Sequence, residues 1–180
     1  MHEEKCIILD FLPNGYAHQR RPEPIAQALG YNFSLLEFVL FPGKLFDPEE
    51  EVVIDKSREK IRFIRRIGFD KLTNFALQNL EECIKRIIIA REKEFIDFFN
   101  TGKMITPRMH QFQLLPGVGK KHVVDILAQR KIKPFEGFDD LSKRVRMFQD
   151  PLKSLVKRVL DELKGNQKYY LFVRIPHHTK

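Results

Sequence analysis

Hydrophobic residues in the first seventy positions fall into short runs separated by turn-forming residues, a pattern typical of β-strands. Apolar and β-branched residues run over 5–12 and 35–41, and Pro-Asn-Gly or Pro-Gly closes each run. Two shorter runs, 52–55 and 59–64, have the same character. The pattern predicts four strands that suit a small barrel, with a short helix or an irregular segment over 24–31.

From Asp70 onward the apolar spacing changes to the 3.6-residue period of helices. This period continues to Phe99, and Asn-Thr-Gly follows as a stop signal, so the stretch is expected to form one long helix or two consecutive helices. Thr106 and Pro107 are typical of the start of another helix. Later patterns predict three more helices and a final strand, over 119–130, 139–147, 150–164 and 168–175.

These elements predict an α+β protein with four parts along the chain. The first is a β domain, the second a connecting helical segment, and the third a helical domain that ends before a C-terminal strand and tail. Their expected boundaries are 1–68, 69–102, 103–165 and 166–180.

Between two of the predicted helices, residues 115–121 read Leu-Pro-Gly-Val-Gly-Lys-Lys. Two glycines around one apolar residue allow a sharp turn that packs the valine inward and turns backbone N–H groups outward. The next helix adds unpaired amides and the positive end of its dipole, which suit a phosphate group. A hairpin with solvated lysines is the alternative. The residues expected to hold phosphate are Gly117, Val118, Gly119, Lys120 and Lys121.

The turn between the last two predicted helices, 148–151, has no glycine. We therefore expect this turn to pack against the glycine corner without binding phosphate itself. The two helix pairs would then support each other, with the ligand on the first pair.

Positive charge is concentrated in the half of the chain that contains this corner. Residues 1–102 hold 15 Lys/Arg against 17 Asp/Glu, whereas residues 103–180 hold 17 against 7. Such an asymmetry points to a polyanionic partner. A charge-rich, heat-adapted surface is the alternative, but it predicts balanced signs.

A second group of basic residues occurs at the end of the predicted barrel. Four of them alternate with other residues, so a strand would place all four on one face, where a phosphate backbone could balance them. A solvated barrel face is the alternative. The residues of this group are Lys56, Arg58, Lys60, Arg62, Arg65 and Arg66.

A polar loop over 14–22 carries an aromatic residue, Tyr16, and two arginines, Arg20 and Arg21. In single-stranded RNA sites such residues stack on bases and pair with phosphates. An ordinary loop between strands explains the same residues equally well. We include all three residues among the candidate contacts.

Other classes of protein are disfavoured by what the sequence lacks. It has no run of eighteen apolar residues, no basic and apolar signal at its start, and no metal-binding spacing around Cys6 or Cys83. The phosphate-loop, zinc-protease and serine-hydrolase motifs are also missing. We therefore expect a cytoplasmic, non-enzymatic protein without a membrane segment, metal or cofactor.

The segment 114–121 resembles the helix-hairpin-helix motif of nucleic-acid-binding proteins. In that family the hairpin amides hold the sugar–phosphate backbone without reading base sequence. DNA glycosylases of the same superfamily place a catalytic aspartate about twenty residues further on, where this chain has Asp139. The Gly-Phe-Asp-Asp-Leu context of Asp139 looks like a helix start, and β structure replaces the helical domain that precedes the motif in glycosylases. The resemblance therefore implies binding, with glycosylase activity as a remote alternative.

Nearly the whole chain resembles an archaeal family of uncharacterised proteins for which RNA binding is predicted. The resemblance rests on the stretches Ala-Gln-Ala-Leu-Gly (26–30), Leu-Leu-Glu (35–37), 94–100, 105–110, 114–121, 134–141 and 168–174. It implies an N-terminal OB-like domain joined to a C-terminal helix-hairpin-helix domain. It also implies a nucleic-acid partner, RNA in preference to DNA, with structured or ribosomal RNA as a candidate. An adaptor that binds an acidic protein is the alternative.

Overall fold

The structure is a computed structural model that describes residues 3–17 and 22–174, and this part of the chain forms two compact units. Unit 1 comprises the described residues up to Ile84 together with 162–166 and 172–174. Unit 2 comprises 85–161 and 167–171. Each unit has its own core, and the mixed α+β composition expected from the sequence is confirmed.

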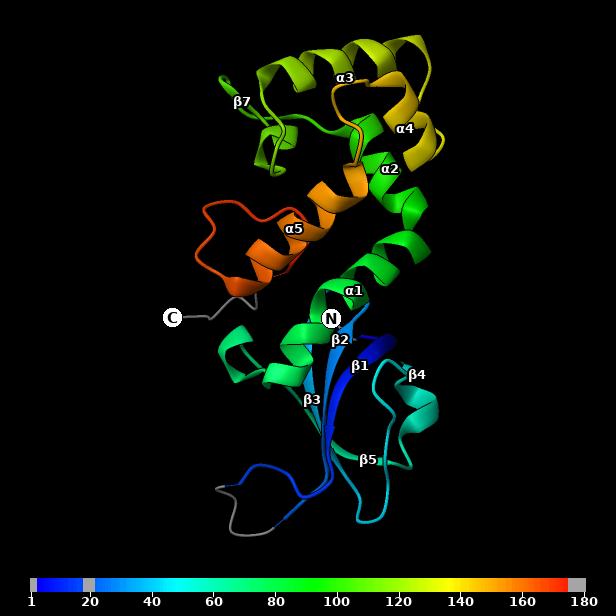
Figure 1. Cartoon of the computed structure of the whole chain (residues 1–180), viewed down its shortest axis with the longest axis vertical. Helices are drawn as coiled ribbons and strands as arrows, with labels where there is room; N and C mark the ends of the chain where they lie inside the picture. The colour runs from blue at the N-terminus through cyan, green and yellow to red at the C-terminus, as the bar shows by residue number, and fades with distance from the viewer. Residues whose placement is uncertain (1–2, 18–21, 175–180) are drawn as a thin grey trace. The chain divides into compact units, whose positions relative to one another are not determined.

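Unit 1 is built on a five-stranded antiparallel sheet with the strand order β4-β1-β2-β3-β5 (Figure 1). The sheet does not close, so the predicted barrel is wrong. The reason lies in β4, which has three residues and runs through Ile54 into the 3₁₀ helix η1 (Asp55–Ser57), leaving too little strand to pair with β5. The strands are β1 (Lys5–Leu12), β2 (Ile25–Gly30), β3 (Leu35–Leu40), β4 (Glu51–Val53) and β5 (Ile61–Arg66).

The sequence predicts a helix or an irregular segment over 24–31, and this prediction is wrong because the structure has the strand β2 there. All six of its residues are buried, because the sheet is covered on both faces. A strand that is buried on both faces lacks the alternation of apolar and polar residues by which strands are recognised. Tertiary packing here overrides the helical preference of Ala and Leu.

One face of the sheet encloses the main core of unit 1. Phe38 lies at its centre, 6.2 Å between ring centroids from Phe46 of the β3–β4 loop. At about 25 cal/mol per Å², burial of such side chains is the main source of stability. The cluster consists of Cys6, Ile8, Ala26, Ala28, Leu36, Phe38, Leu40, Phe46, Val52, Ile54 and Ile61.

The helical stretch after residue 70 forms two consecutive helices, α1 (Asn74–Ala90) and α2 (Glu92–Thr101), after the 3₁₀ helix η2 (Phe69–Lys71). This agrees with one of the two alternatives left open by the sequence. At the end of α2, Arg130 donates to the carbonyl oxygens of Phe99 (3.1 Å) and Gly102 (3.0 Å). The last carbonyl groups of α2 are thereby satisfied by a side chain.

The predicted helix that starts at Thr106 is wrong. The chain forms two short paired strands, β6 (Met104–Thr106) and β7 (Met109–His110), and then a single 3₁₀ turn, η3 (Gln111–Leu114). Polar side chains compete with helical hydrogen bonds here. His110 Nδ1 accepts from the Phe112 amide (3.2 Å), and Gln113 Oε1 accepts from the His110 amide (2.9 Å).

Three more α-helices follow along the chain and lie close to their predicted positions. Asp150 caps the last of them as expected, because its Oδ1 accepts from the Lys153 amide at 2.8 Å. The helices are α3 (Lys120–Ile132), α4 (Phe138–Arg144) and α5 (Pro151–Lys164).

The predicted strand over 168–175 is wrong as far as residue 174, where the described part of the chain ends. Gly165 and Asn166 have φ of 88° and 60° and turn the chain sharply after α5. The amides of Phe172 and Val173 then donate to Glu162 Oε2, at 2.9 and 2.8 Å, in place of a neighbouring strand. Throughout the described residues, no helix has the length and apolar character needed to cross a membrane.

Candidate nucleic-acid interface

The corner between η3 and α3 has the sharp turn that its two glycines predict. Gly117 has φ of +84°, in the left-handed region that glycine adopts without strain. Val118 is 7% exposed and packs into the core of unit 2. Gly119 is extended, with φ −96° and ψ −178°, and precedes the first residue of α3. The corner therefore exposes two residues without side chains beside the start of a helix.

The outward-facing amides differ from the predicted set. The Val118 amide donates to the Leu115 carbonyl at 3.1 Å, and the Gly119 amide donates to His122 Nδ1 at 3.1 Å. Two of the three expected donors are thus occupied within the chain. Lys120 and Lys121 are the first residues of α3, so their amides have no acceptor within the helix. Neither lysine forms an ion pair with another described residue, and both side chains are exposed.

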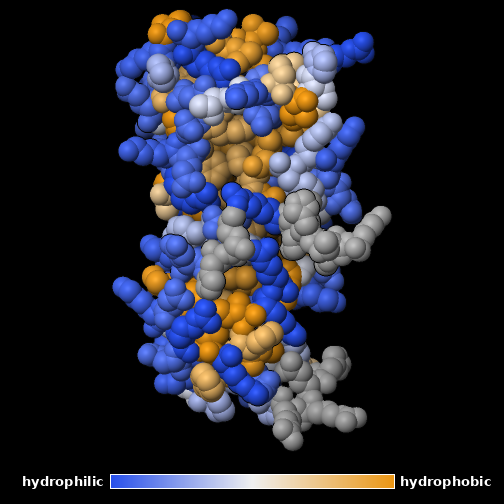
Figure 2. Space-filling model, turned by 180° about the vertical axis from the view of Figure 1, so that it is seen from behind, coloured by the Kyte–Doolittle hydropathy of each residue, from blue (hydrophilic) through white to orange (hydrophobic). Residues whose placement is uncertain are grey.

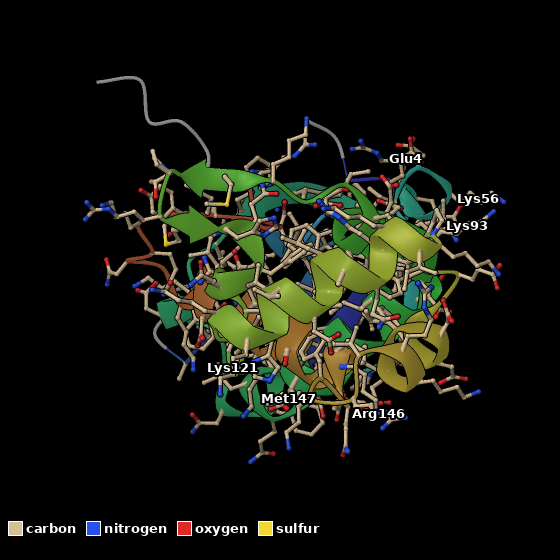
Figure 3. The ribbon with its side chains drawn as sticks, turned by 90° about the horizontal axis from the view of Figure 1, so that it is seen from above. Glu4, Lys56, Lys93, Lys121, Arg146 and Met147 are labelled. Atoms are coloured by element: carbon tan, nitrogen blue, oxygen red, sulfur yellow. The ribbon has the colours of Figure 1, made fainter. Side chains whose placement is uncertain are left out.

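His122 connects this corner to the turn between α4 and α5. Because Nδ1 accepts a hydrogen bond, Nε2 carries the ring proton and donates to the Met147 carbonyl at 3.1 Å. In Figure 3, Lys121 of α3 and Arg146 and Met147 of the second turn lie along the same edge. The expected packing of the two turns is present, and Arg146 is a basic residue of this edge that sequence reasoning missed.

Three arginines of unit 2 contribute to the positive charge but stabilise the fold. Besides Arg130 in the α2 cap, Arg144 donates to the Gln129 carbonyl near the end of α3 and to the Lys133 and Pro134 carbonyls that follow the helix. Arg158 is 6% exposed and donates to the Leu114 carbonyl at 3.2 Å. Figure 2 shows hydrophilic side chains over much of the face in view, so hydrophilic character alone does not locate a site. The corner is distinguished by its backbone geometry.

In unit 1, the predicted row of four cations on one strand is wrong. Lys56 lies in η1, Arg58 and Lys60 lie in the turn after it, and Arg62 alone belongs to β5. The 3₁₀ helix breaks the two-residue period on which the prediction depended. The structure nevertheless gathers part of the group around a hollow of about 410 Å³, whose lining includes Arg58, Arg62, Arg65 and Arg66.

Tyr16 is held by a polar row that crosses the sheet. Its hydroxyl donates to Glu37 Oε2 (2.5 Å) and accepts from Gln27 Nε2 (2.8 Å). Glu37 Oε1 also accepts from Arg65 Nε at 2.7 Å, and Gln27, Glu37 and Arg65 are neighbours on adjacent strands. Tyr16 and Arg65 thus have fixed positions at a second hollow of about 510 Å³. Arg20 and Arg21, the other candidates of this loop, lie outside the described residues.

This arrangement predicts that one tyrosine ionises late. Burial, and then the neighbouring Glu37 carboxylate, raise the pKa of Tyr16 to about 12 from 10.0. The folded state therefore keeps a proton that the unfolded state loses, so this contribution to stability is complete below pH 10 and is lost between pH 10 and 12. An absorbance titration at 295 nm should show a late phase that disappears in Tyr16→Phe; an unchanged profile would contradict the hydrogen-bonded row.

The residues considered for catalysis or metal binding lie in separate elements. Asp139, the residue considered for glycosylase chemistry, is exposed in the first turn of α4. Cys6 of β1 and Cys83 of α1 are free and buried, and burial raises the pKa of Cys6 to about 12. The described part of the chain contains no group of three or more His, Cys, Asp or Glu placed to hold a metal ion.

Comparisons with known proteins place the chain in a family. A family model described as "Protein of unknown function (DUF655)" matches residues 2–174. An uncharacterized protein of Methanocaldococcus jannaschii, MJ0038, is 37% identical over 177 residues, which cover 96% of this chain and 80% of the relative. The crystal structure of Af1531 from Archaeoglobus fulgidus, assigned to the same family model, is 42% identical with a TM-score of 0.86, and the match covers 96% of this chain and 100% of the other. The chain therefore belongs to the DUF655 family, which has archaeal members.

Proposed function

We propose that this protein binds nucleic acid, RNA in preference to DNA, by holding the sugar–phosphate backbone at the corner formed by Gly117–Lys121. One observation carries the proposal: two exposed glycines stand directly before a helix whose first amides and first two side chains, Lys120 and Lys121, are unpaired among the described residues. Amides at a helix start together with lysines match the charge and geometry of a phosphate. Contacts of this kind fix the position of the ligand without reading its bases.

The surroundings of the corner support a ligand longer than one phosphate. Arg146 lies on the same edge as Lys121 (Figure 3), and His122 ties the two turns together. Unit 1 has a basic surface of its own, formed by the arginines around its two hollows. The proposed role is binding without catalysis, in keeping with the helix-hairpin-helix and OB-like resemblance of the sequence.

Gly119→Ala tests the proposal without disturbing the fold. A Cβ at Gly119 would meet no neighbour closer than His122 Nδ1 at 3.8 Å, and its backbone angles suit any residue. The added methyl group would keep a phosphate backbone away from the amides of α3. We expect RNA binding to weaken by at least about tenfold, the worth of one charged hydrogen bond. Fluorescence anisotropy with matched RNA and DNA strands measures the change.

Val124→Ala is the matched control, because Val124 is 67% exposed on the same helix and lies away from the corner in sequence. This variant should bind like the original protein. Equal affinity of Gly119→Ala and the original protein would show that the backbone does not approach the corner. Failure of the original protein to bind any nucleic acid at low salt would contradict the proposed function and favour an acidic protein partner.

A further inference from the structure

The two edges of the sheet in unit 1 border one hollow. From the β4 side its lining includes Glu3, Ile54 and Arg58, and from β5 it includes every residue from Arg62 to Arg66. The hollow lies along the two outer strands of the sheet, β4 and β5, which are not paired with each other. Its position at an open sheet edge gives an extended ligand access to it.

The lining of this hollow is rich in arginine, and three of its four arginines pair with carboxylates that lie outside the lining. Glu3 is its only lining carboxylate among the described residues, and Glu3 Oε2 already accepts from the backbone amide (2.9 Å) and side chain (3.1 Å) of Asn32. Four arginines also line the hollow. Two of them, Arg58 and Arg62, form exposed ion pairs with Asp55 and Glu23, which contribute little to stability and are readily exchanged for a phosphate.

The remaining two arginines, Arg65 and Arg66, differ in whether they already pair with a carboxylate. Arg65 is oriented by the buried Glu37 carboxylate, which is 1% exposed, so its guanidinium keeps one position. Arg66 lines both hollows and forms no ion pair with another described residue. A phosphate bound by Arg66 would therefore displace no internal partner.

An exposed aromatic ring, that of Phe63, lines the same hollow as these arginines. Phe63 lies on β5 opposite Val39 and is 57% exposed, although it lines the hollow. An exposed phenylalanine on an edge strand contributes little to the core and favours unwanted association. An exposed ring in a hollow lined by arginines is an arrangement on which unpaired bases stack while their phosphates are neutralised.

We propose that the hollow along β5 binds a single-stranded segment of nucleic acid, with one base stacked on Phe63 and an adjacent phosphate held by Arg66. This inference rests on the proposed function and adds a requirement to it, namely that part of the ligand is unpaired. The bases of a duplex are stacked on each other and cannot reach an isolated ring. Phe63→Ala is expected to weaken single-strand binding by about 5- to 150-fold and to leave duplex binding unchanged.

The chain contains no tryptophan, so Phe63→Trp creates a unique fluorescent reporter at the hollow. Phe75→Trp is the matched control, because Phe75 is 47% exposed in α1 and lines neither hollow. Both variants are titrated with a single-stranded RNA, with the same RNA as a duplex, and with inorganic polyphosphate. We expect the single strand to quench the fluorescence of the Phe63→Trp variant. The duplex and polyphosphate should give no comparable quenching, and the Phe75→Trp variant should respond to none of the three ligands.

Anisotropy of a labelled copy of the same RNA separates failure of this inference from failure of the proposed function. Normal binding by the Phe63→Trp variant without quenching of its indole would overturn the stacking site and leave the corner as the interface. Equal quenching by polyphosphate would also overturn it, because charge without bases would then suffice. Absence of binding in both assays would overturn the proposed function and the stacking site together.

Discussion

Raising the salt concentration from 50 to 200 mM is expected to weaken RNA binding by about 130- to 500-fold. The proposed contacts neutralise about five phosphates, and each neutralised phosphate releases condensed counterions. The logarithm of affinity should then fall with the logarithm of salt concentration with a slope of about −3.5 for a single strand to −4.5 for a duplex. Anisotropy titrations at four or five salt concentrations give this slope directly.

Two double variants assign part of the slope to the corner. Lys120→Glu with Lys121→Glu should make the slope shallower by about 2, one unit for each lost phosphate contact. Lys153→Glu with Lys157→Glu changes the charge equally at exposed positions of α5 and should leave the slope close to its original value. A flat slope in the original protein, or an equal effect of both double variants, would contradict phosphate binding at the corner.

Gly102→Ala is expected to lower the free energy of unfolding of unit 2 by about 3 kcal/mol. A Cβ at this position would lie 2.4 and 2.8 Å from two ring carbons of Phe112 and 2.8 Å from the Phe98 carbonyl oxygen. Phe112 is fully buried, with Phe98 and Phe99 at centroid distances of 5.4 and 5.6 Å, so its ring has no room to move. Urea denaturation followed by circular dichroism measures the loss.

Gly119→Ala is the comparison for this substitution as well. Its nearest neighbour at 3.8 Å allows an ordinary contact, so a change below about 1 kcal/mol is expected at this helix N-cap. If the Gly102→Ala variant were as stable as the original protein, that result would contradict the close packing of the end of α2 against η3.

The elements that the sequence predicts well are those whose pattern depends on one buried face. Helices α1, α2 and α5 carry a clear period of 3.6 residues, and strands β1 and β3 are apolar runs closed by turn residues. Strand β2 is buried on both faces and so has no such period. The four-residue turn η3 replaces a helix because His110 and Gln113 bond to nearby amides, a competition that apolar periodicity does not record.

For the candidate site, the sequence predicts the place of the corner but not which of its amides face solvent. The Pro-Gly-Val-Gly stretch favours a turn at this place, whereas the imidazole that occupies the Gly119 amide comes from a residue three positions further on. Histidine three positions after a glycine is too common to be informative by itself. The arginines around the β5 hollow were expected on one strand, and the 3₁₀ helix η1 brings Arg58 to them by another route.

The division of the chain also determines how its function can be dissected. Neither unit is a continuous segment. Unit 1 takes up the chain again over 162–166 and 172–174, unit 2 takes it up over 167–171, and the boundary after Ile84 falls inside α1. A fragment that ends at residue 84 would carry only the first 11 of the 17 residues of α1 and would lack residues 162–166 and 172–174, which belong to the same unit. Separately expressed halves are therefore poor reagents, and the contributions of the corner and the β5 hollow to ligand binding should be separated by point substitutions in the intact polypeptide.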